Sequence, residues 1–380
     1  MQDMEARSQL RTGRVALVWL VGMVAVVGAD SLLFRTRWYP SILQPDSSTG
    51  IFELILNRER DAQRQNGDNL VVTLGDSRFS YLPREAAEYT KETGYTIRSA
   101  GVAGSDARTW FYMLRDLDPT RCRYRAIVIG VNDYDDEDGP EDVNDDLRAL
   151  HYAAARLRWR DVPEFAFSFS SAGARWQALR GSVLKGLVFQ ADVQEFLTDP
   201  RKRLDYVQLC RRGFASWTWD YQESPRSLAG LEVDWKSWKA KWPADCDVGQ
   251  RETVERALMY HPFPHTGTVA RFRRRWFGKI AERYRGSRTK IVFLKLPRGP
   301  VVRPDWLHVS RPGVIRELAA QPNVILADEH AYDALERPEL FKDGLHLNRE
   351  GVRRFSAMLQ REVRKMLGPV TQGFTANSLR

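Results

Sequence analysis

Five short runs of β-branched and other apolar residues, separated by stretches long enough for a helix, constrain the fold more than any other feature. The runs are residues 70–74, 96–100, 124–129, 290–296 and 323–327. Such runs with helix-length spacers are typical of parallel strands that are buried on both faces. The sequence therefore predicts an α/β fold with three layers, in which helices cover both sides of a central parallel sheet.

Polar or glycine residues follow the first three predicted strands. In open parallel sheets, ligand sites gather outside the carboxyl ends of the strands, where Ser77, Gly104 and Asn132 are expected. Ser77 ends a Gly-Asp-Ser turn, and the residues after it, including Pro83 and Glu85, predict a helix. The N-terminus of a helix favours negative charge nearby, so Ser77 is well placed to be a nucleophile. An ordinary turn is the alternative, because Gly, Asp and Ser are common turn residues.

A second candidate group lies near the C-terminus. Asp343 and His346 are three positions apart and precede an amphipathic helix for which Asn348 is the predicted N-cap. This spacing lets the carboxylate reach one imidazole nitrogen while the other nitrogen faces outward. A carboxylate in that place fixes the tautomer and stabilises the imidazolium that forms when histidine accepts a proton. A surface loop with an incidental Asp and His is the alternative.

Together, four motifs resemble those of the SGNH or GDSL-type esterases and acyltransferases. They occur in the order of that family: Gly75-Asp76-Ser77, the glycine turn ending at Gly104, residues 130–133 and residues 343–346. The resemblance covers about 70–144 and 289–367 and implies the flavodoxin-like three-layer fold of the family. The sequence has no Gly-x-Ser-x-Gly elbow, so it does not support the commoner α/β-hydrolase arrangement.

By position, the resemblance assigns a role to five residues. It makes Ser77 the nucleophile, His346 the general base and then general acid, and Asp343 the residue that orients His346. It also implies an oxyanion hole made by the backbone N–H groups of Ser77 and Gly104 and the side-chain amide of Asn132. An amide suits position 132, because a carboxylate there would repel the oxyanion.

The resemblance implies a serine esterase or O-acyltransferase that works through an acyl-serine intermediate. The expected substrates are acyl esters of an extracytoplasmic glycan, and acetyl is the acyl group that we expect. A lipid or thioester hydrolase is one alternative, and a catalytically idle glycan-binding or assembly subunit of a cell-envelope polysaccharide system is another. Arg78 and Leu347 stand where the family often has Leu and Pro, and these departures bear on substrate preference more than on chemistry.

An apolar run, Val15–Phe34, follows three arginines at the N-terminus. About 20 apolar residues suffice to cross a bilayer, and a basic flank tends to stay in the cytoplasm. We therefore expect 1–37 to be a signal anchor that holds the rest of the chain at the periplasmic side or the cell surface. Cleavage before Asp30, after the small residues of a signal-peptide-like site, is the alternative.

The net charge of +9 suggests an anionic neighbour. Nucleic acid is not expected, because the chain is predicted to lie outside the cytoplasm. The expected partners are an acylated glycan or another ester substrate, the membrane through the N-terminal helix, and a membrane protein that donates the acyl group. No cofactor is expected. Three cysteines, Cys122, Cys210 and Cys246, allow one disulfide at most, and a Cys210–Cys246 bridge and free thiols both remain open.

The remaining chain is divided by composition. We expect a connector at 38–69, two parts of the catalytic domain at 70–146 and 289–368, and a tail at 369–380. Segment 147–288 is too long for one crossover and is expected to be a mostly helical insertion or cap. It is basic and rich in tryptophan. Either it forms a lid or groove for sugar rings, anionic polymers or lipid headgroups, or its tryptophans are core and its arginines are a solvated face.

Two further patterns bear on metal binding. The acidic run from Asp135 to Asp146 lacks the glycine and bidentate acid that a calcium loop needs at fixed offsets, so we expect a solvated acidic loop and helix start. His261 and His265 flank prolines that break any helix able to align them, and the sequence offers no third ligand. No metal site is expected.

Overall fold

The computed structural model describes residues 2–36, 38–63, 69–79, 92–139, 142–214, 227–307 and 311–370. The chain divides into two compact units: unit 1 is Met1–Leu54 with Asp145–Arg212, and unit 2 is Ile55–Asn144 with Gly213–Arg380. The segment expected as one insertion, 147–288, is therefore shared between the units, with the division after Arg212.

Unit 2 is built on a parallel sheet of five strands in the order β2-β1-β3-β6-β7. The strands are β1 (Leu70–Leu74), β2 (Thr96–Ser99), β3 (Ala126–Val131), β6 (Lys290–Lys295) and β7 (Val324–Leu326). Each of the five predicted strands is present, which confirms the α/β fold with a parallel sheet. The chain leaves β1 for β2 on one side and returns to β3 on the other, so the topological switch point lies between β1 and β3.

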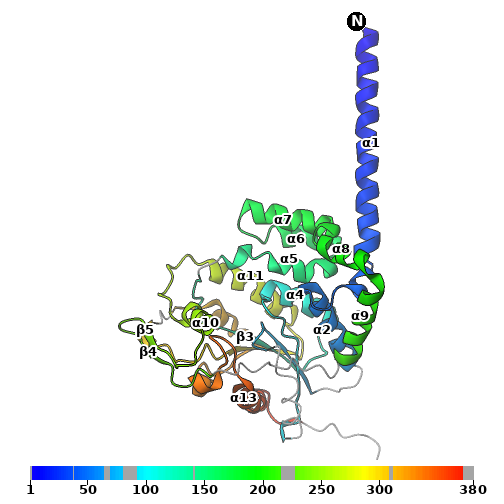
Figure 1. Cartoon of the computed structure of the whole chain (residues 1–380). Coiled ribbons are helices and arrows are strands. Elements are labelled where there is room, and N and C mark those ends of the chain that lie inside the picture. The colour runs from blue at the N-terminus through cyan, green and yellow to red at the C-terminus, as the bar shows by residue number, and fades with distance from the viewer. Residues whose placement is uncertain are drawn as a thin grey trace, which may run out of the picture. The chain divides into compact units, whose positions relative to one another are not determined.

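One face of the sheet is covered by the helices α4 (Ala107–Leu117) and α11 (Thr268–Arg283) (Figure 1). Phe277 of α11 stacks on Trp110 of α4, with ring centroids 6.3 Å apart, and meets Phe293 of β6 edge to face at 4.9 Å. Trp276 is fully buried beside it. Helix α11 lies in the stretch expected as an insertion. Because its aromatic side chains pack on α4 and β6, it is instead a core helix of unit 2.

The opposite face is covered by α13 (Arg349–Leu367). Successive strand residues point to opposite faces, so Val292 and Leu294 lie in a core with Phe355 and Leu359 of α13, whereas Phe293 faces α11. The predicted cap of α13 is confirmed, because Asn348 Oδ1 accepts the backbone N–H of Gly351 at 3.0 Å.

The other elements of unit 2 are α10 (Val248–Leu258), α12 (Val314–Leu318) and the antiparallel hairpin of β4 (Glu232–Asp234) and β5 (Lys239–Lys241). The hairpin was not predicted, because its three-residue strands carry exposed charged residues and no apolar run. The helical character expected within 38–69 is confirmed by α2 (Ser48–Gln63), within which the division between the units falls after Leu54. The helix predicted after Ser77 and the tail after residue 370 lie outside the described residues.

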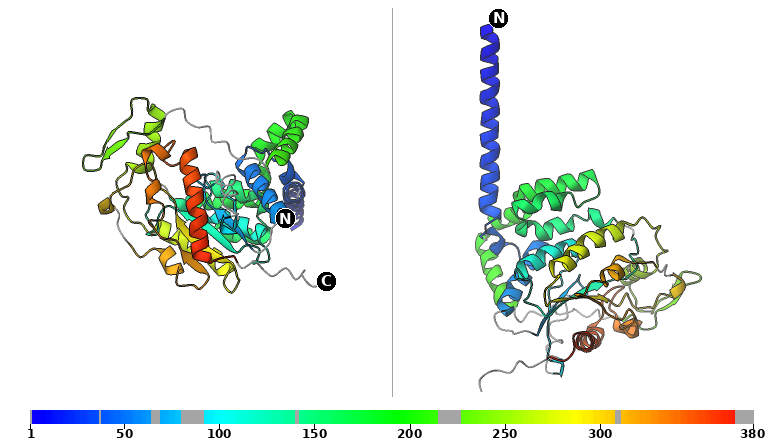
Figure 2. Two further views of the ribbon diagram at one scale, coloured as in Figure 1. Left: turned by 90° about the horizontal axis from the view of Figure 1, so that it is seen from below. Right: turned by 180° about the vertical axis from the view of Figure 1, so that it is seen from behind.

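Unit 1 is helical. Its helices are α1 (Gln2–Phe34), α5 (Arg148–Ala153), α6 (Val162–Ala166), α7 (Ala172–Val183), α8 (Gln190–Thr198) and α9 (Pro200–Phe214). A small core joins the end of α1 to the turn before α8, where the rings of Phe34 and Phe189 stack at 5.4 Å. Within α1, Val15–Phe34 is long and apolar enough to cross a membrane, and it extends away from the other helices of unit 1 (Figures 1 and 2).

Short 3₁₀ helices complete the two units at Tyr39–Ile42, Val143–Asp145, Ala154–Arg156, Trp159–Asp161, Lys185–Leu187, Asp305–Leu307, Asp333–Leu335 and Pro338–Leu340. The three cysteines are free thiols: Cys122 is exposed, Cys210 is half-buried and Cys246 is buried. Of the two alternatives that the sequence left open, the structure has free thiols.

Candidate active site

Three residues that the sequence places far apart are hydrogen-bonded in a row in unit 2. Ser77 Oγ lies 2.7 Å from His346 Nε2. His346 Nδ1 lies 3.0 Å from Oδ1 and 2.9 Å from Oδ2 of Asp343. The structure therefore brings together the three predicted catalytic residues in the order hydroxyl, imidazole and carboxylate. This is the arrangement in which a serine can pass its proton to histidine.

Local backbone structure places each member of this row. Ser77 lies in a turn directly after β1, closed by the Phe79 N–H donating to Asp76 O at 3.1 Å. Asp343 Oδ1 accepts the backbone N–H groups of Leu345 at 2.9 Å and His346 at 2.8 Å. These two bonds fold the loop before α13 back on itself and hold the carboxylate beside its own imidazole.

The electrostatics of Asp343 suit a residue that orients histidine. Burial alone would raise the pKa of its carboxyl. Hydrogen bonds and charge from His346, together with the backbone N–H groups of Leu345 and His346, outweigh burial and hold the pKa of Asp343 below its ordinary value. The carboxylate therefore stays ionised at neutral pH and can stabilise an imidazolium.

The Gly104 turn lies beside the Ser77 turn. The Val102 N–H donates to Gly75 O at 3.0 Å, which fixes the loop after β2 to the end of β1. The turn is closed by the Ser105 N–H donating to Val102 O at 3.0 Å, and Gly104 has a φ of 68°. Glycine is required there because a residue with a side chain is strained in the left-handed region.

Asn132 follows β3 and contacts Arg78, the residue after Ser77. The guanidinium of Arg78 donates from Nη2 to Asn132 Oδ1, and it pairs with Asp76 at 2.8 Å. Arginine has only donors, so the amide oxygen of Asn132 faces Arg78 and its NH₂ group faces away. Sequence reasoning connected Arg78 with substrate preference and missed this contact, because residue spacing does not show where a long side chain ends.

The side chain of Phe79 explains why positions 75 and 130 of the motifs are glycine. Its ring is fully buried, and a Cβ added at Gly75 or at Gly130 would lie 2.4 Å from a ring carbon. The ring therefore fits between the ends of β1 and β3 only because both positions lack a side chain. Through this ring, the turn that holds Ser77 packs on the strand that leads to Asn132.

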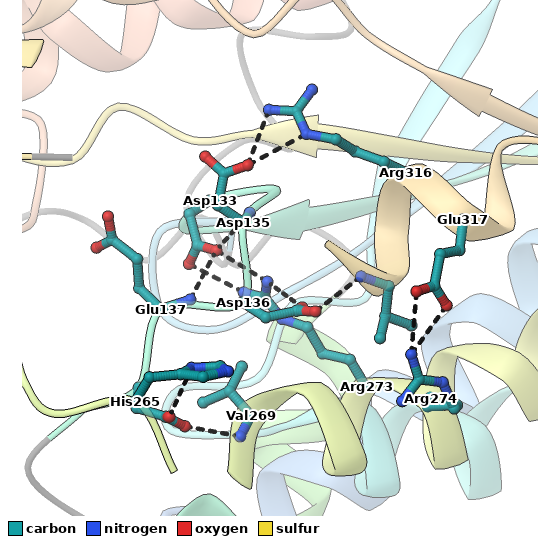
Figure 3. Close-up of polar contacts among 12 residues, drawn as sticks. Asp133, Asp135, Asp136, Glu137, His265, Val269, Arg273, Arg274, Arg316 and Glu317 are labelled. Atoms are coloured by element: carbon teal, nitrogen blue, oxygen red, sulfur yellow. Dashed lines mark hydrogen bonds and ion pairs between the residues drawn. The ribbon is translucent and has the colours of Figure 1, made fainter. Parts of the chain in front are cut away.

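The acidic run after Asn132 is tied to α11 (Figure 3). Arg273 holds Asp133 with two hydrogen bonds of 2.9 and 3.0 Å and also donates to Asp136 at 2.9 Å. Asp136 accepts the N–H of Val314, the first residue of α12, at 2.7 Å. The expectation of a solvated acidic loop is therefore wrong for Asp136, because its carboxylate is buried and paired with a buried arginine, whereas Asp142 is exposed.

Asp138 accepts hydrogen bonds from backbone N–H groups at the start of α11. Its carboxylate accepts the N–H groups of Thr266, Gly267 and Val269, and these bonds hold its pKa below the ordinary value although burial acts in the opposite direction. His265 lies 3.3 Å from the same carboxylate. Among the described residues, no group of three or more His, Cys, Asp or Glu side chains could hold a metal ion.

The tryptophans of segment 147–288 differ in burial, and Trp235, Trp238 and Trp242 are half-buried. Trp276 is fully buried in the core of unit 2, whereas Trp159 and Trp176 are exposed on unit 1. Trp217 and Trp219 lie outside the described residues. Trp276 is therefore a core residue, and the lid or groove formed by the rest of the segment stays a prediction.

A pocket of about 570 Å³ is lined by Asn132 and by the chain neighbours of Ser77 and His346, namely Asp76, Arg78 and Leu345. Buried Arg303 is part of the wall, where its guanidinium carbon lies 4.5 Å from the ring centre of Tyr260. Its Nε is buried without a hydrogen-bond partner in the described part of the chain. The lining residues are Asp76, Arg78, Asn132, Asp133, Glu137, Asp138, Gly139, Glu255, Arg256, Ala257, Leu258, Met259, Tyr260, Phe263, Arg298, Arg303 and Leu345.

The chain was compared with protein families and with curated proteins. No family model matches it, and no curated protein matches it. Its function must therefore be inferred from the residues that meet at the carboxyl edge of the sheet.

Proposed function

We propose that this protein is a serine esterase or O-acyltransferase of the SGNH type. The observation that supports this most directly is the row Ser77, His346 and Asp343, joined by hydrogen bonds of 2.7 to 3.0 Å. Counted along the chain, the strand order of the sheet is 2-1-3-4-5, which is the flavodoxin-like order that the resemblance implies. The four motifs and this topology are the support for the family.

In the first half of the reaction, Ser77 Oγ attacks the ester carbonyl while His346 Nε2 accepts its proton. Asp343 holds the Nδ1–H of the imidazolium that results. The carbonyl oxygen becomes an alkoxide, for which the N–H groups of Ser77 and Gly104 and the amide of Asn132 are the proposed donors. One such donor typically lowers the barrier by roughly 3 kcal/mol. The alcohol then leaves with the proton of His346, and the acyl group remains on Ser77.

In the second half, a second hydroxyl group attacks the acyl-serine. His346 accepts its proton and returns it to Ser77 Oγ as the C–O bond breaks. Water as the acceptor gives hydrolysis, whereas a sugar hydroxyl held in a cleft without water gives transfer. The same three residues serve both outcomes.

The pocket beside the serine offers both apolar and charged groups to a glycan. Tyr260 and Phe263 offer apolar ring faces, and Arg256 is the arginine exposed at a wall that also carries the carboxylates of Asp76, Asp133, Glu137, Asp138 and Glu255. Carboxylate or phosphate groups are the usual partners of such guanidinium groups. The net charge of +9 is consistent with the same class of substrate.

The N-terminal helix supports the proposed location. We propose that Val15–Phe34 of α1 anchors the protein in a membrane, with the catalytic unit at the periplasmic side or the cell surface. A membrane protein that supplies the acyl group is then the expected partner for transfer.

The test is covalent labelling of the full chain in detergent with a fluorophosphonate probe, followed by mass mapping. We expect an adduct on Ser77 that is lost in Ser77→Ala and strongly reduced in His346→Ala. His330→Ala is a matched control, because His330 pairs with Asp333 at the same spacing on the exposed surface, with Nδ1 2.7 Å from the carboxylate. An unlabelled but folded protein would contradict the proposal and favour an idle scaffold.

Competition in the same assay separates the substrate classes. Acetylated uronic acid oligosaccharides should protect Ser77 at lower concentration than acetylated neutral sugars, lipid esters or acyl thioesters. Stronger protection by lipid esters or thioesters would instead support the alternative hydrolases.

A further inference from the structure

Unit 1 presents a group of exposed aromatic and basic side chains around α7 that no part of the proposed chemistry uses. We call it the Trp-Arg face, and it consists of Trp159, Arg160, Phe167, Arg175, Trp176 and Arg180. We propose that this face lies on the surface of the bilayer that α1 crosses and binds anionic phospholipid headgroups. The inference rests on the proposed membrane anchor and is independent of the proposed acyl chemistry.

Direct contacts fix this face to the end of α1. The guanidinium carbon of Arg35, one residue after α1, lies 3.8 Å from the ring centre of Trp159. At the other end of α7, the backbone N–H groups of Lys185 and Gly186 donate to the carboxylate of Asp30 at 3.0 and 2.7 Å. Both turns that flank α6 and α7 are therefore held at the point where the apolar segment ends.

The arrangement of unit 1 directs the face toward the bilayer. Figures 1 and 2 show α7 on the side of the helices toward which α1 extends, whereas α9 runs in the opposite direction. If Val15–Phe34 spans the bilayer, the headgroups begin beside α7. The Trp-Arg face would then lie at the level of the membrane where the proposed span ends.

The composition of the face suits lipid headgroups. Trp159 is 47% exposed, and Phe167 and Trp176 are each 62% exposed, which is a high exposure for large aromatic side chains. Helix α7 has no acidic residue, and its arginines Arg175 and Arg180 are exposed beside Trp176. Tryptophan next to arginine is typical of surfaces that lie at the boundary between headgroups and acyl chains, and the positive charge favours anionic lipid.

The test places nitroxide labels at three positions of the full chain, reconstituted in phosphatidylcholine vesicles with and without phosphatidylglycerol. The background is Cys122→Ser with Cys210→Ser, since Cys246 is buried. The labelled variants are Gly173→Cys, Leu209→Cys and Val24→Cys. Gly173 is three positions before Trp176 on the same side of α7, and a side chain added there meets no atom within 4 Å. Leu209 is the matched control on α9, where it is exposed.

Collision with oxygen and with a water-soluble nickel chelate reports the depth of each label. We expect the label at 24 to be deep, the label at 209 to be in water, and the label at 173 to be at the interface when phosphatidylglycerol is present. Arg175→Glu with Arg180→Glu should move the label at 173 into water while the label at 24 stays deep.

Three results would overturn the inference. A label at 173 that is as accessible to nickel as the label at 209, with the label at 24 deep, excludes the contact but leaves the anchor. A label at 24 in water excludes both the anchor and the face. A label at 173 that lies equally deep with and without phosphatidylglycerol excludes recognition of anionic lipid. None of these results affects labelling of Ser77 by the fluorophosphonate, so failure here is distinct from failure of the proposed enzyme activity.

Discussion

Arg78 and Asn132 are joined by a hydrogen bond from the guanidinium to Oδ1, and this bond determines which way the Asn132 amide faces. Arg78 is itself held by Asp76, to which it donates from Nε at 3.1 Å and from Nη2 at 2.8 Å. Burial would raise the pKa of Asp76, but the charge and hydrogen bonds of Arg78 outweigh it and lower that pKa. Arg78, the residue after Ser77, is thus a positioning residue for a proposed oxyanion donor.

We expect Arg78→Leu to lower kcat about tenfold with little change in KM, because loss of one hydrogen bond to a charged group is worth about 1.5 kcal/mol or more. Asn132→Ala should lower kcat about 10²-fold or more through loss of a donor. In the Asn132→Ala background, Arg78→Leu should have little further effect. Steady-state kinetics of the two single variants and the double variant measure this coupling.

Arg274→Leu is the control for the Arg78 cycle, because Arg274 is exposed and pairs only with Glu317 among the described residues, at 2.9 Å. Its kcat should equal that of the wild type. Fully additive losses in the double variant would show that Arg78 acts independently of Asn132.

The Asp133–Arg273 pair makes stability depend on acid pH. Burial would raise the pKa of Asp133, but Arg273 and the N–H groups of Glu137 and Asp135 lower it. A carboxyl with a lowered folded pKa contributes stability that is present above the unfolded pKa of about 3.9 and is lost as the pH falls through the folded value.

We therefore expect the difference in Tm between wild type and Asp133→Asn to be largest above about pH 5 and to shrink below about pH 4. Thermal unfolding across this range measures it. Glu317→Gln, at an exposed pair, should show almost no difference at any pH. A pH-independent difference for Asp133→Asn would mean that its charge does not contribute.

The packing of Phe79 predicts a coupled effect on stability. Gly130→Ala should lower the free energy of unfolding by about 1–3 kcal/mol, because the new Cβ overlaps the buried ring. In a Phe79→Leu background the additional cost should be much smaller. Gly278→Ala on α11 is the control, since its Cβ meets no atom within 4 Å and should stabilise the helix by about 0.5–1 kcal/mol. Equal costs of Gly130→Ala in both backgrounds would show that Phe79 is not the obstacle.

Lys185 makes unit 1 sensitive to alkaline pH. Burial, with the nearby charge of Arg35, lowers its pKa to about 7. The unfolded chain then binds more protons than the folded chain between about pH 7 and 10.4, so stability should rise with pH over that range. Lys185→Met should raise the stability at pH 7 and remove this slope. Hydrogen exchange of peptides from unit 1, followed against pH, measures this change in stability. An unchanged slope in Lys185→Met would assign the pH dependence of stability to another group.

Much of unit 2 was predictable because its signals are local. Strands buried on both faces require continuous apolar runs, so β1, β3 and β6 could be located from composition. The cap of α13 was also readable, because Asn348 binds a backbone group three residues away. The parallel strands then bring Ser77, Gly104 and Asn132 to one edge of the sheet.

The pairing of charges was not predictable in the same way. Asp136 and Arg273 are 137 positions apart, and the acidic run has the same composition whether it is solvated or buried. A charge becomes buried only when a partner from another element reaches it, and spacing along the chain does not show that partner. The expectation of a solvated loop failed for this reason.

The sequence by itself determined the order of the strands along the chain, the cap of α13, the apolar span and the candidate row of Ser77, His346 and Asp343, since each depends on residues close in sequence or on a known motif. Only the tertiary structure decided that α11 is a core helix, that Phe79 needs both Gly75 and Gly130, that Arg78 orients Asn132, and that 145–212 packs with the end of α1. These relations depend on contacts between distant segments, and such contacts form only when the chain has folded.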